Sequence, residues 1–138
     1  MLEKYYLYRI KYIDYIIIIK YGNFYETFDK DALIINKLFD YKINKIKNTF
    51  KVGFPISSIN NVILKLNNYN INYVVIDNEN IINNKVFDNN NYNDYSFNID
   101  VIRYNLILID SISKYLTSNV LNENISEKLY KIKEIIDE

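Results

Sequence analysis

Four consecutive isoleucines, Ile16 to Ile19, run into Gly22, and this stretch constrains the fold more than any other. A short unbroken run of β-branched residues predicts a strand that is buried on both faces. The run is far shorter than the roughly 20 residues that a membrane-spanning helix requires. Gly22 is one of only two glycines in the 138-residue chain. We expect the strand to end there and residues 24–28 to continue it after the glycine.

The hydrophobic pattern alternates between strands and helices over the first two thirds of the chain. Apolar spacing predicts helices at residues 2–12, 29–39 and 58–69. It predicts strands at residues 14–21, 41–46, 50–54, 73–77 and 81–87. The third helix carries a regular apolar face, made by Ile59, Val62, Ile63, Leu66 and Tyr69, and we expect Ser57 or Ser58 to cap it. Residues 88–95 read as a loop. The fold class is therefore mixed αβ, with a mixed sheet flanked by helices over residues 1–95.

Residues 96–138 form a second predicted region, which is helical throughout. Residues 97–118 are apolar around more than half of the helical circumference, too much for packing on one side only. Residues 125–136 carry one apolar stripe, and Asn124 with Glu127 resembles a capping box at their start. We interpret this region as a C-terminal αα-hairpin. It either packs across the sheet or associates with another chain.

Composition excludes several kinds of chemistry. The chain has no Cys and no His, which rules out disulfides, thiol nucleophiles and catalysis that depends on histidine. Zinc sites with the usual ligands are excluded as well. The first residues carry charge throughout and do not resemble a signal peptide, so we expect a cytoplasmic protein with no membrane contact.

Charge is unevenly distributed although the net charge is zero. Residues 1–70 carry 11 Lys and Arg against 6 Asp and Glu, and residues 71–138 carry 6 against 11. The basic excess is densest at Lys42, Lys45, Lys47 and Lys51. Only this N-terminal half is suited to attract phosphates. The plain alternative is a solvated hairpin with lysines that protect a sheet edge.

Two further patterns are weak evidence for an enzyme. Ser111 to Lys114 matches S-x-x-K, but the partner motifs of that enzyme class are missing. Five carboxylates could in principle hold a metal: Asp29, Asp31, Asp77, Glu79 and Asp88. The first two stand at a helix start, where the helix dipole explains them without a metal. We expect neither enzymatic activity nor a metal or other cofactor.

Several short motifs follow one another between Tyr15 and Asp77. Gly22-Asn23-Phe24-Tyr25-Glu26 precedes Phe28 to Ala32 (FDKDA), and Gly53-Phe54-Pro55 comes later. This ordered set resembles the N-terminal, mismatch-recognising domain of the MutS family of DNA mismatch-repair proteins. That domain carries Gly-x-Phe-Tyr-Glu, an aromatic–acidic–Asp-Ala helix start, and Gly-Ile-Pro or Gly-Val-Pro. By this resemblance, Gly22, Gly53 and Pro55 are structural turn residues.

The resemblance implies a binding function and assigns its residues. In that family the Phe matching Phe24 wedges beside a mispaired or unpaired base, and the Glu matching Glu26 hydrogen-bonds to that base. The implied partner is mispaired or distorted duplex DNA, which we expect to be bound with low affinity. Lys45, Lys47 and Asn48, at the tip of the predicted hairpin, would be the phosphate contacts.

Strand geometry supports this assignment independently of the family. Residues i and i+2 of an extended segment point the same way, about 7 Å apart. Phe24 and Glu26 therefore share a face, and Tyr25 points to the other face, where a core could hold it. The alternative places Phe24 in the core and Glu26 at a sheet edge. An unpaired carboxylate beside Phe24 disfavours that alternative.

The sequence also departs from the family. It contains no G-x-x-x-x-G-K-[ST], so we expect no ATPase. Ile56-Ser57-Ser58 stands where the family has Tyr-His-Ala. A second hypothesis therefore remains: a protein-interaction or dimerisation module that keeps the fold without reading DNA. Its partner would be a second copy or a repair protein, bound through the helices at residues 97–136.

Overall fold

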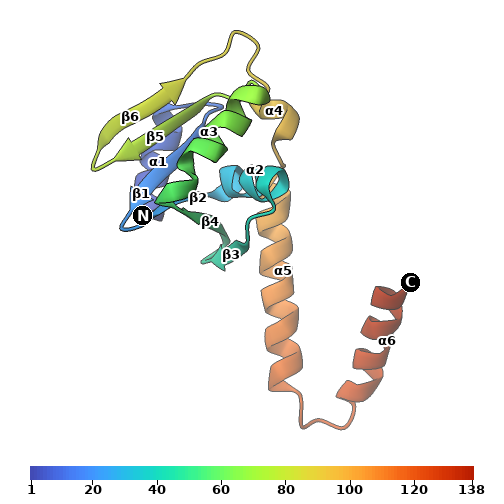
Figure 1. Cartoon of the computed structure of the whole chain (residues 1–138). Coiled ribbons are helices and arrows are strands. Elements are labelled where there is room, and N and C mark those ends of the chain that lie inside the picture. Colours follow the sequence, from blue (N-terminus) through green and yellow to red (C-terminus); the bar gives the residue numbers. More distant parts are fainter. The chain divides into compact units, whose positions relative to one another are not determined.

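The computed structural model describes residues 1–138, which divide into two compact units, Met1–Ile99 and Asp100–Glu138. The first unit is built on a six-stranded sheet with the order β3-β4-β2-β1-β5-β6 (Figure 1). The strands are β1 (Ile16–Tyr21), β2 (Phe24–Phe28), β3 (Ile43–Ile46), β4 (Thr49–Pro55), β5 (Tyr73–Asp77) and β6 (Asn80–Lys85). The helices of this unit are α1 (Leu2–Lys11), α2 (Asp29–Phe39), the 3-10 turn η1 (Ile56–Ser58), α3 (Ile59–Asn68) and α4 (Tyr92–Tyr95).

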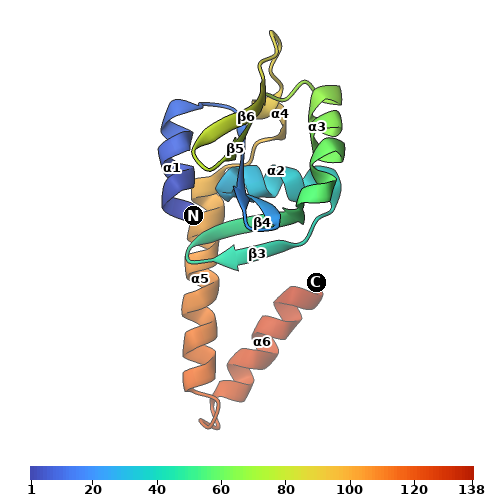
Figure 2. The same cartoon turned by 60° about the vertical axis from the view of Figure 1, so that its left-hand side comes forward.

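The sheet is mixed. β1 and β5 are parallel, with Ile16 opposite Tyr73, and every other neighbouring pair is antiparallel. Helices α2 and α3 connect strands across one face of the sheet, and α1 lies against the other face (Figure 2). The predicted fold class, a mixed sheet flanked by helices, is confirmed.

The isoleucine run lies at the centre of two cores. Ile16 and Ile18 belong to the cluster under α2 and α3, and Ile17 and Ile19 belong to the cluster under α1. All four are at most 4% exposed. The prediction of a strand buried on both faces is confirmed. The apolar stripe predicted for α3, from Ile59 to Tyr69, also packs into the first cluster.

Two predictions about the chain path are wrong. Residues 24–28 do not continue the first strand: β2 folds back antiparallel beside β1, with Tyr21 opposite Phe24. Residues 88–95 are not only a loop, because they contain the one-turn helix α4. Tyr92 on α4 is fully buried, so the absence of hydrophobic periodicity in this segment concealed an anchoring residue.

The predicted caps and one predicted helical face also need correction. Neither Ser58 before α3 nor Asn124 before the last helix makes a side-chain capping hydrogen bond. Phe28 has the spacing to share a helical face with Ala32 and Ile35, but it ends β2 and packs under α1, whereas Ala32 and Ile35 pack in the other cluster. The chain changes direction at Asp29, whose φ is +59°, and helical periodicity does not extend across that change.

The second unit consists of helices. It holds α5 (Ile99–Ser118), whose first residue belongs to the first unit, and α6 (Ile125–Asp137). Both helices form where the sequence predicts them. None of the helices in the chain has the length and apolar character needed to cross a membrane.

Candidate nucleic-acid interface

The motif Gly22 to Glu26 forms the turn and first half of a β-hairpin. Gly22 and Asn23 connect β1 to β2, and Gly22 has a φ of +60°. A two-residue hairpin turn with positive φ at its first position favours glycine there, because a side chain would strain the backbone. A Cβ at Gly22 would meet no atom within 4 Å, so the need for glycine is conformational and not steric.

Successive residues of β2 point to opposite faces of the sheet. Tyr25 is 5% exposed and packs in the core under α2 and α3, with its ring 5.9 Å from that of Phe54. Phe24, on the opposite face, is 51% exposed and belongs to neither core cluster. Half of an aromatic ring is thus presented to solvent beside a tight turn, as the spacing of the motif predicts.

The motif Gly53-Phe54-Pro55 lies directly alongside. Phe24 stands opposite Pro55 and Glu26 stands opposite Gly53 in the antiparallel pairing of β2 with β4. The backbone N–H of Ile56 donates to the carbonyl of Asn23 at 3.2 Å, which joins the end of β4 to the turn. The two motifs that carry the family resemblance are therefore neighbours in space.

Glu26 is not an open carboxylate. Its side chain is only 10% exposed, and its Oε2 lies 2.9 Å from the Nζ of Lys51 on β4. Lys51 is two residues from Gly53, so it lies on the same face of the sheet as Glu26 and Phe24. Because a buried carboxylate is costly without a partner, this ion pair explains how Glu26 tolerates its position.

The other predicted contacts lie elsewhere on the sheet. Lys47 and Asn48 form the turn between β3 and β4, and Lys45 is on β3. This turn precedes Thr49, six residues before Pro55 on β4, so it is about 20 Å from Phe24 along the strand. Lys47 also pairs with Glu3 of α1 at 3.3 Å. Phe24 and Glu26 are therefore brought together, and the hairpin-tip residues are separated from them.

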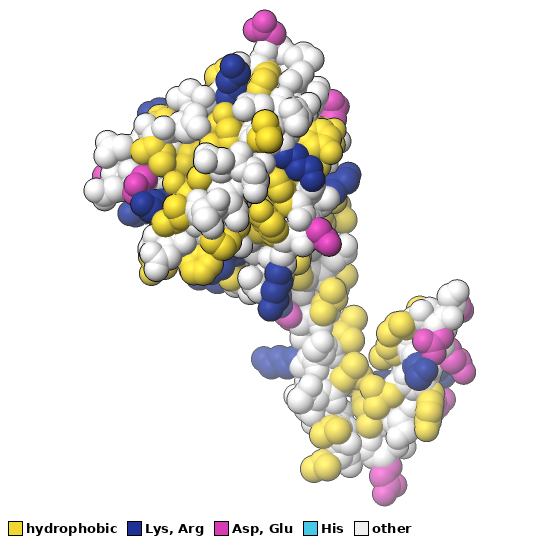
Figure 3. All heavy atoms as spheres, viewed as in Figure 1, with side chains coloured by type: hydrophobic (Ala, Val, Ile, Leu, Met, Phe, Trp, Pro, Cys, Tyr) yellow, Lys and Arg dark blue, Asp and Glu magenta, His cyan; other side chains and the backbone are white.

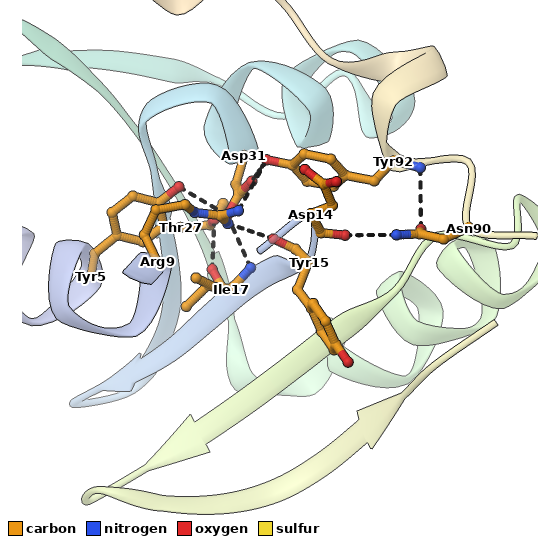
Figure 4. Close-up of polar contacts among 9 residues, drawn as sticks. All are labelled: Tyr5, Arg9, Asp14, Tyr15, Ile17, Thr27, Asp31, Asn90 and Tyr92. Atoms are coloured by element: carbon orange, nitrogen blue, oxygen red, sulfur yellow. Dashed lines mark hydrogen bonds and ion pairs between the residues drawn. The ribbon is translucent and has the colours of Figure 1, made fainter. Parts of the chain in front are cut away.

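A buried polar cluster fixes the elements around this hairpin. The carboxylate of Asp31, at the start of α2, is fully buried. It accepts hydrogen bonds from the Tyr5 hydroxyl at 2.9 Å, the Ile17 N–H at 3.0 Å and the Tyr92 hydroxyl at 2.5 Å (Figure 4). It also forms an ion pair with the guanidinium of Arg9 on α1. One carboxylate thus connects α1, β1, α2 and α4.

Burial shifts the proton equilibria of this cluster. It raises the pKa of the Asp31 carboxyl, a shift opposed by the Arg9 guanidinium and by the hydrogen bonds from Tyr92, Ile17 and Tyr5. Burial acts to lower the pKa of Arg9, but the neighbouring carboxylate prevails and the pKa of Arg9 is raised. Burial, and then the charge of Asp31, raise the pKa of Tyr5 and of Tyr92. Both phenols therefore stay protonated as hydrogen-bond donors.

Sequence reasoning missed two functional relationships. It assigned Asp31 to the helix dipole, whereas a buried cluster built from α1 and α4 uses its carboxylate. It counted Lys51 only as one member of a basic stretch. The pairing of Lys51 with Glu26 could have been derived only from the register of β2 against β4, which local patterns do not fix.

Comparison with known families agrees with this geometry. The family described as MutS domain I matches residues 1–103 of the chain, which include the whole sheet and the hairpin that carries Phe24. The chain therefore belongs to the MutS domain I family.

A curated relative is similar to part of the chain. The DNA mismatch repair protein MutS of Thermosipho melanesiensis is 35% identical to the chain over 66 residues. The match covers 48% of this chain and 8% of that protein. The match thus spans only a small part of that relative's length.

Proposed function

We propose that the chain binds mispaired or distorted duplex DNA through Phe24 and Glu26 and acts by binding alone, without ATPase or other enzymatic activity. The observation that carries the proposal is the orientation of the motif. Tyr25 is buried at 5% exposure, while Phe24 beside it is 51% exposed next to a two-residue turn. A large apolar ring held outside both cores is available to stack on a base.

The physical basis is a difference in unstacking cost. Inserting a ring beside a base requires a few kcal/mol of unstacking, and less where the base is already mispaired. Stacking on an aromatic side chain returns roughly 1–3 kcal/mol per base. The net gain is therefore larger at a mismatch. The carboxylate of Glu26 on the same face would accept a hydrogen bond from a displaced base edge.

The charge of the chain supports weak binding. The net charge is zero, so few cations are available to replace counterions on the phosphates. Lys45, Lys47 and Asn48 would contact phosphates about 20 Å along β4 from the ring. Lys45 stands opposite Phe50, on the face of the sheet away from Phe24, so it would reach the duplex only around the edge of the sheet.

Binding of Phe24→Ala to matched and mispaired duplexes tests the proposal. At stated low salt, the full chain should prefer the mispaired duplex, and Phe24→Ala should lose roughly tenfold in mismatch affinity while matched binding hardly changes. Phe24→Tyr serves as the matched control, because it keeps a ring that can stack. Thermal melting comes first, since a half-exposed ring outside the core predicts a small change in melting temperature.

Two results would contradict the proposal. Equal binding of the wild type to both duplexes would show that the chain does not distinguish mispaired from matched DNA. A core Phe→Ala change costs about 3–5 kcal/mol of stability. A fall in the melting temperature of Phe24→Ala that corresponds to such a loss would assign Phe24 to the core.

A second candidate function, self-association, rests on the helices of the second unit. Apolar side chains lie along both helices (Figure 3). On α5, a stripe of residues spaced three or four apart is 42–61% exposed, and it consists of Val101, Tyr104, Leu108, Ile112 and Tyr115. On α6, Leu129 and Ile136 are 42% and 75% exposed. So much exposed apolar surface is typical of an interaction site.

A second copy of the chain is the occupant that fits these helices best. In a two-fold interface the same stripe is supplied from both sides, so the apolar area doubles without a separate partner. The second unit carries five Lys and Arg against seven Asp and Glu, and this near balance keeps repulsion between two copies small. Dimerisation would also raise a weak affinity for DNA by avidity.

Sedimentation analysis of the full chain over a range of concentrations tests this second function. We expect a dimer that Leu108→Glu with Ile112→Glu converts to a monomer. Ser113→Glu, which adds a charge away from the stripe, is the control and should remain dimeric. A wild-type chain that stays monomeric at every concentration would exclude a second copy and leave a different protein as the occupant.

A further inference from the structure

The ion pair between Lys51 and Glu26 stands where the proposed function requires a carboxylate. The two residues belong to neighbouring strands, and their side chains meet diagonally on the face that also presents Phe24. The Lys51 side chain is 32% exposed and the Glu26 side chain is 10% exposed. The lysine therefore covers one side of the carboxylate and remains partly in solvent.

Gly53 contributes no side chain beside the Glu26 carboxylate. It stands directly opposite Glu26 on β4, and a Cβ placed there would lie 4.0 Å from the Glu26 Cγ. With no side chain at that position, nothing from Gly53 covers Glu26 on this face. The ion pair engages Oε2, so Oε1 is the oxygen not held by Lys51 in this pair, although the Glu26 side chain as a whole is only 10% exposed.

The ion pair of Lys51 and Glu26 also changes the charge that this face of the sheet presents to DNA. A bare carboxylate brought against DNA meets the negative potential of the phosphates, whereas a carboxylate paired with an ammonium group presents no net charge. A pair that is largely desolvated also holds its side chains in one geometry, because separating them leaves a buried charge without a partner.

We propose that Lys51 is a positioning residue for mismatch reading: it holds the carboxylate of Glu26 beside Phe24 with one oxygen presented to a displaced base, and it neutralises that carboxylate against the phosphates. This inference rests on the proposed function, because it names the residue through which Glu26 acts. A competing role is a plain phosphate contact, in which Lys51 would strengthen binding to any duplex irrespective of Glu26.

A double-mutant cycle separates the two roles. Lys51→Met keeps the apolar stem and removes the charge, and Lys51→Arg keeps the charge. We expect Lys51→Met in the full chain to reduce the preference for mispaired over matched duplex about tenfold, and Lys51→Arg to retain most of it. In a Glu26→Gln background, Lys51→Met should change the preference by less than about twofold, because the group it positions is gone. Melting curves of all variants report whether each remains folded.

Each outcome either supports or refutes the positioning role of Lys51. If Lys51→Met keeps the wild-type preference, or loses it equally in the Glu26→Gln background, the positioning role is refuted while the proposed function stands. If the wild type shows no preference, or if Phe24→Ala keeps it, the proposed function fails and the role of Lys51 fails with it. If Lys51→Met does not fold, the double variant with Glu26→Gln, which leaves no unpaired charge, supplies the comparison with Glu26→Gln alone. A further loss of preference in that double variant refutes the role, and an unchanged preference supports it.

Discussion

Replacing Arg9 with methionine should be among the most damaging single changes in the first unit. Arg9 lies on α1, its side chain is 17% exposed, and its guanidinium pairs with the fully buried carboxylate of Asp31. The same guanidinium donates a hydrogen bond to the backbone carbonyl of Tyr15. Methionine fills a similar length with apolar atoms but supplies no charge and no donor. The change therefore leaves a buried carboxylate without its cation.

The magnitude follows from the burial of Asp31. Removing one partner of a buried ion pair typically costs about 3–5 kcal/mol, since the remaining charge is left uncompensated. The Tyr5, Tyr92 and Ile17 donors remain and limit the loss to that range. A domain of this size has a total stability of about 5–15 kcal/mol. At about 4–8 °C per kcal/mol, the melting temperature should fall by roughly 12–40 °C.

Thermal unfolding followed by circular dichroism measures this loss. Lys11→Met is the matched control, because it removes an exposed charge from the same helix and should change stability little. In Arg9→Met the pKa of Asp31 should rise further, so the folded state binds a proton more tightly than the unfolded state. The stability of this variant should therefore increase as the pH falls from 7 toward 5.

A small loss would refute the reasoning. If Arg9→Met unfolds within a few degrees of the wild type, the guanidinium does not stabilise the Asp31 carboxylate. If its melting temperature does not respond to pH between 7 and 5, the buried carboxyl is not the group left unpaired.

Three further predictions concern the tyrosines, the hairpin turn and the basic tip. The pKa values of Tyr5 and Tyr92 are raised in the folded state, so just above pH 10 only the unfolded chain loses these protons. The free energy of unfolding should therefore fall with rising pH there, by about 1.4 kcal/mol per pH unit for each phenol. Urea midpoints at pH 9 to 11 measure this dependence, and a flat profile would contradict it. Gly22→Ala should cost about 1–2 kcal/mol through backbone strain at φ +60°, and a melting temperature equal to that of the wild type would show that the turn adapts. Lys45→Ala with Lys47→Ala should weaken binding to matched and mispaired duplex about equally and make the salt slope shallower by up to ~2, whereas an unchanged slope would place the phosphate contacts elsewhere.

Local sequence determined the elements that depend on short-range rules. A β-branched run such as Ile16 to Ile19 is predictable as a buried strand because both of its faces are apolar. The face of α3 is predictable because helical spacing puts Ile59 and Leu66 on one side. The opposite orientations of Phe24 and Tyr25 follow from the two-residue period of a strand.

Only the tertiary structure decided which distant side chains meet. Glu26 and Lys51 pair because β2 and β4 align in one register, and a shift of one residue would turn Lys51 to the other face. Asp31 and Tyr92 are 61 residues apart, and the Tyr92 hydroxyl donates to Asp31 only because α4 packs against the start of α2. Such contacts arise when elements pack together, and the local sequence pattern of one element does not indicate which distant element it contacts. The sequence by itself therefore determined the buried strand and the opposite orientations of Phe24 and Tyr25, and packing decided that β2 folds back beside β1 and that Lys51 is the partner of Glu26.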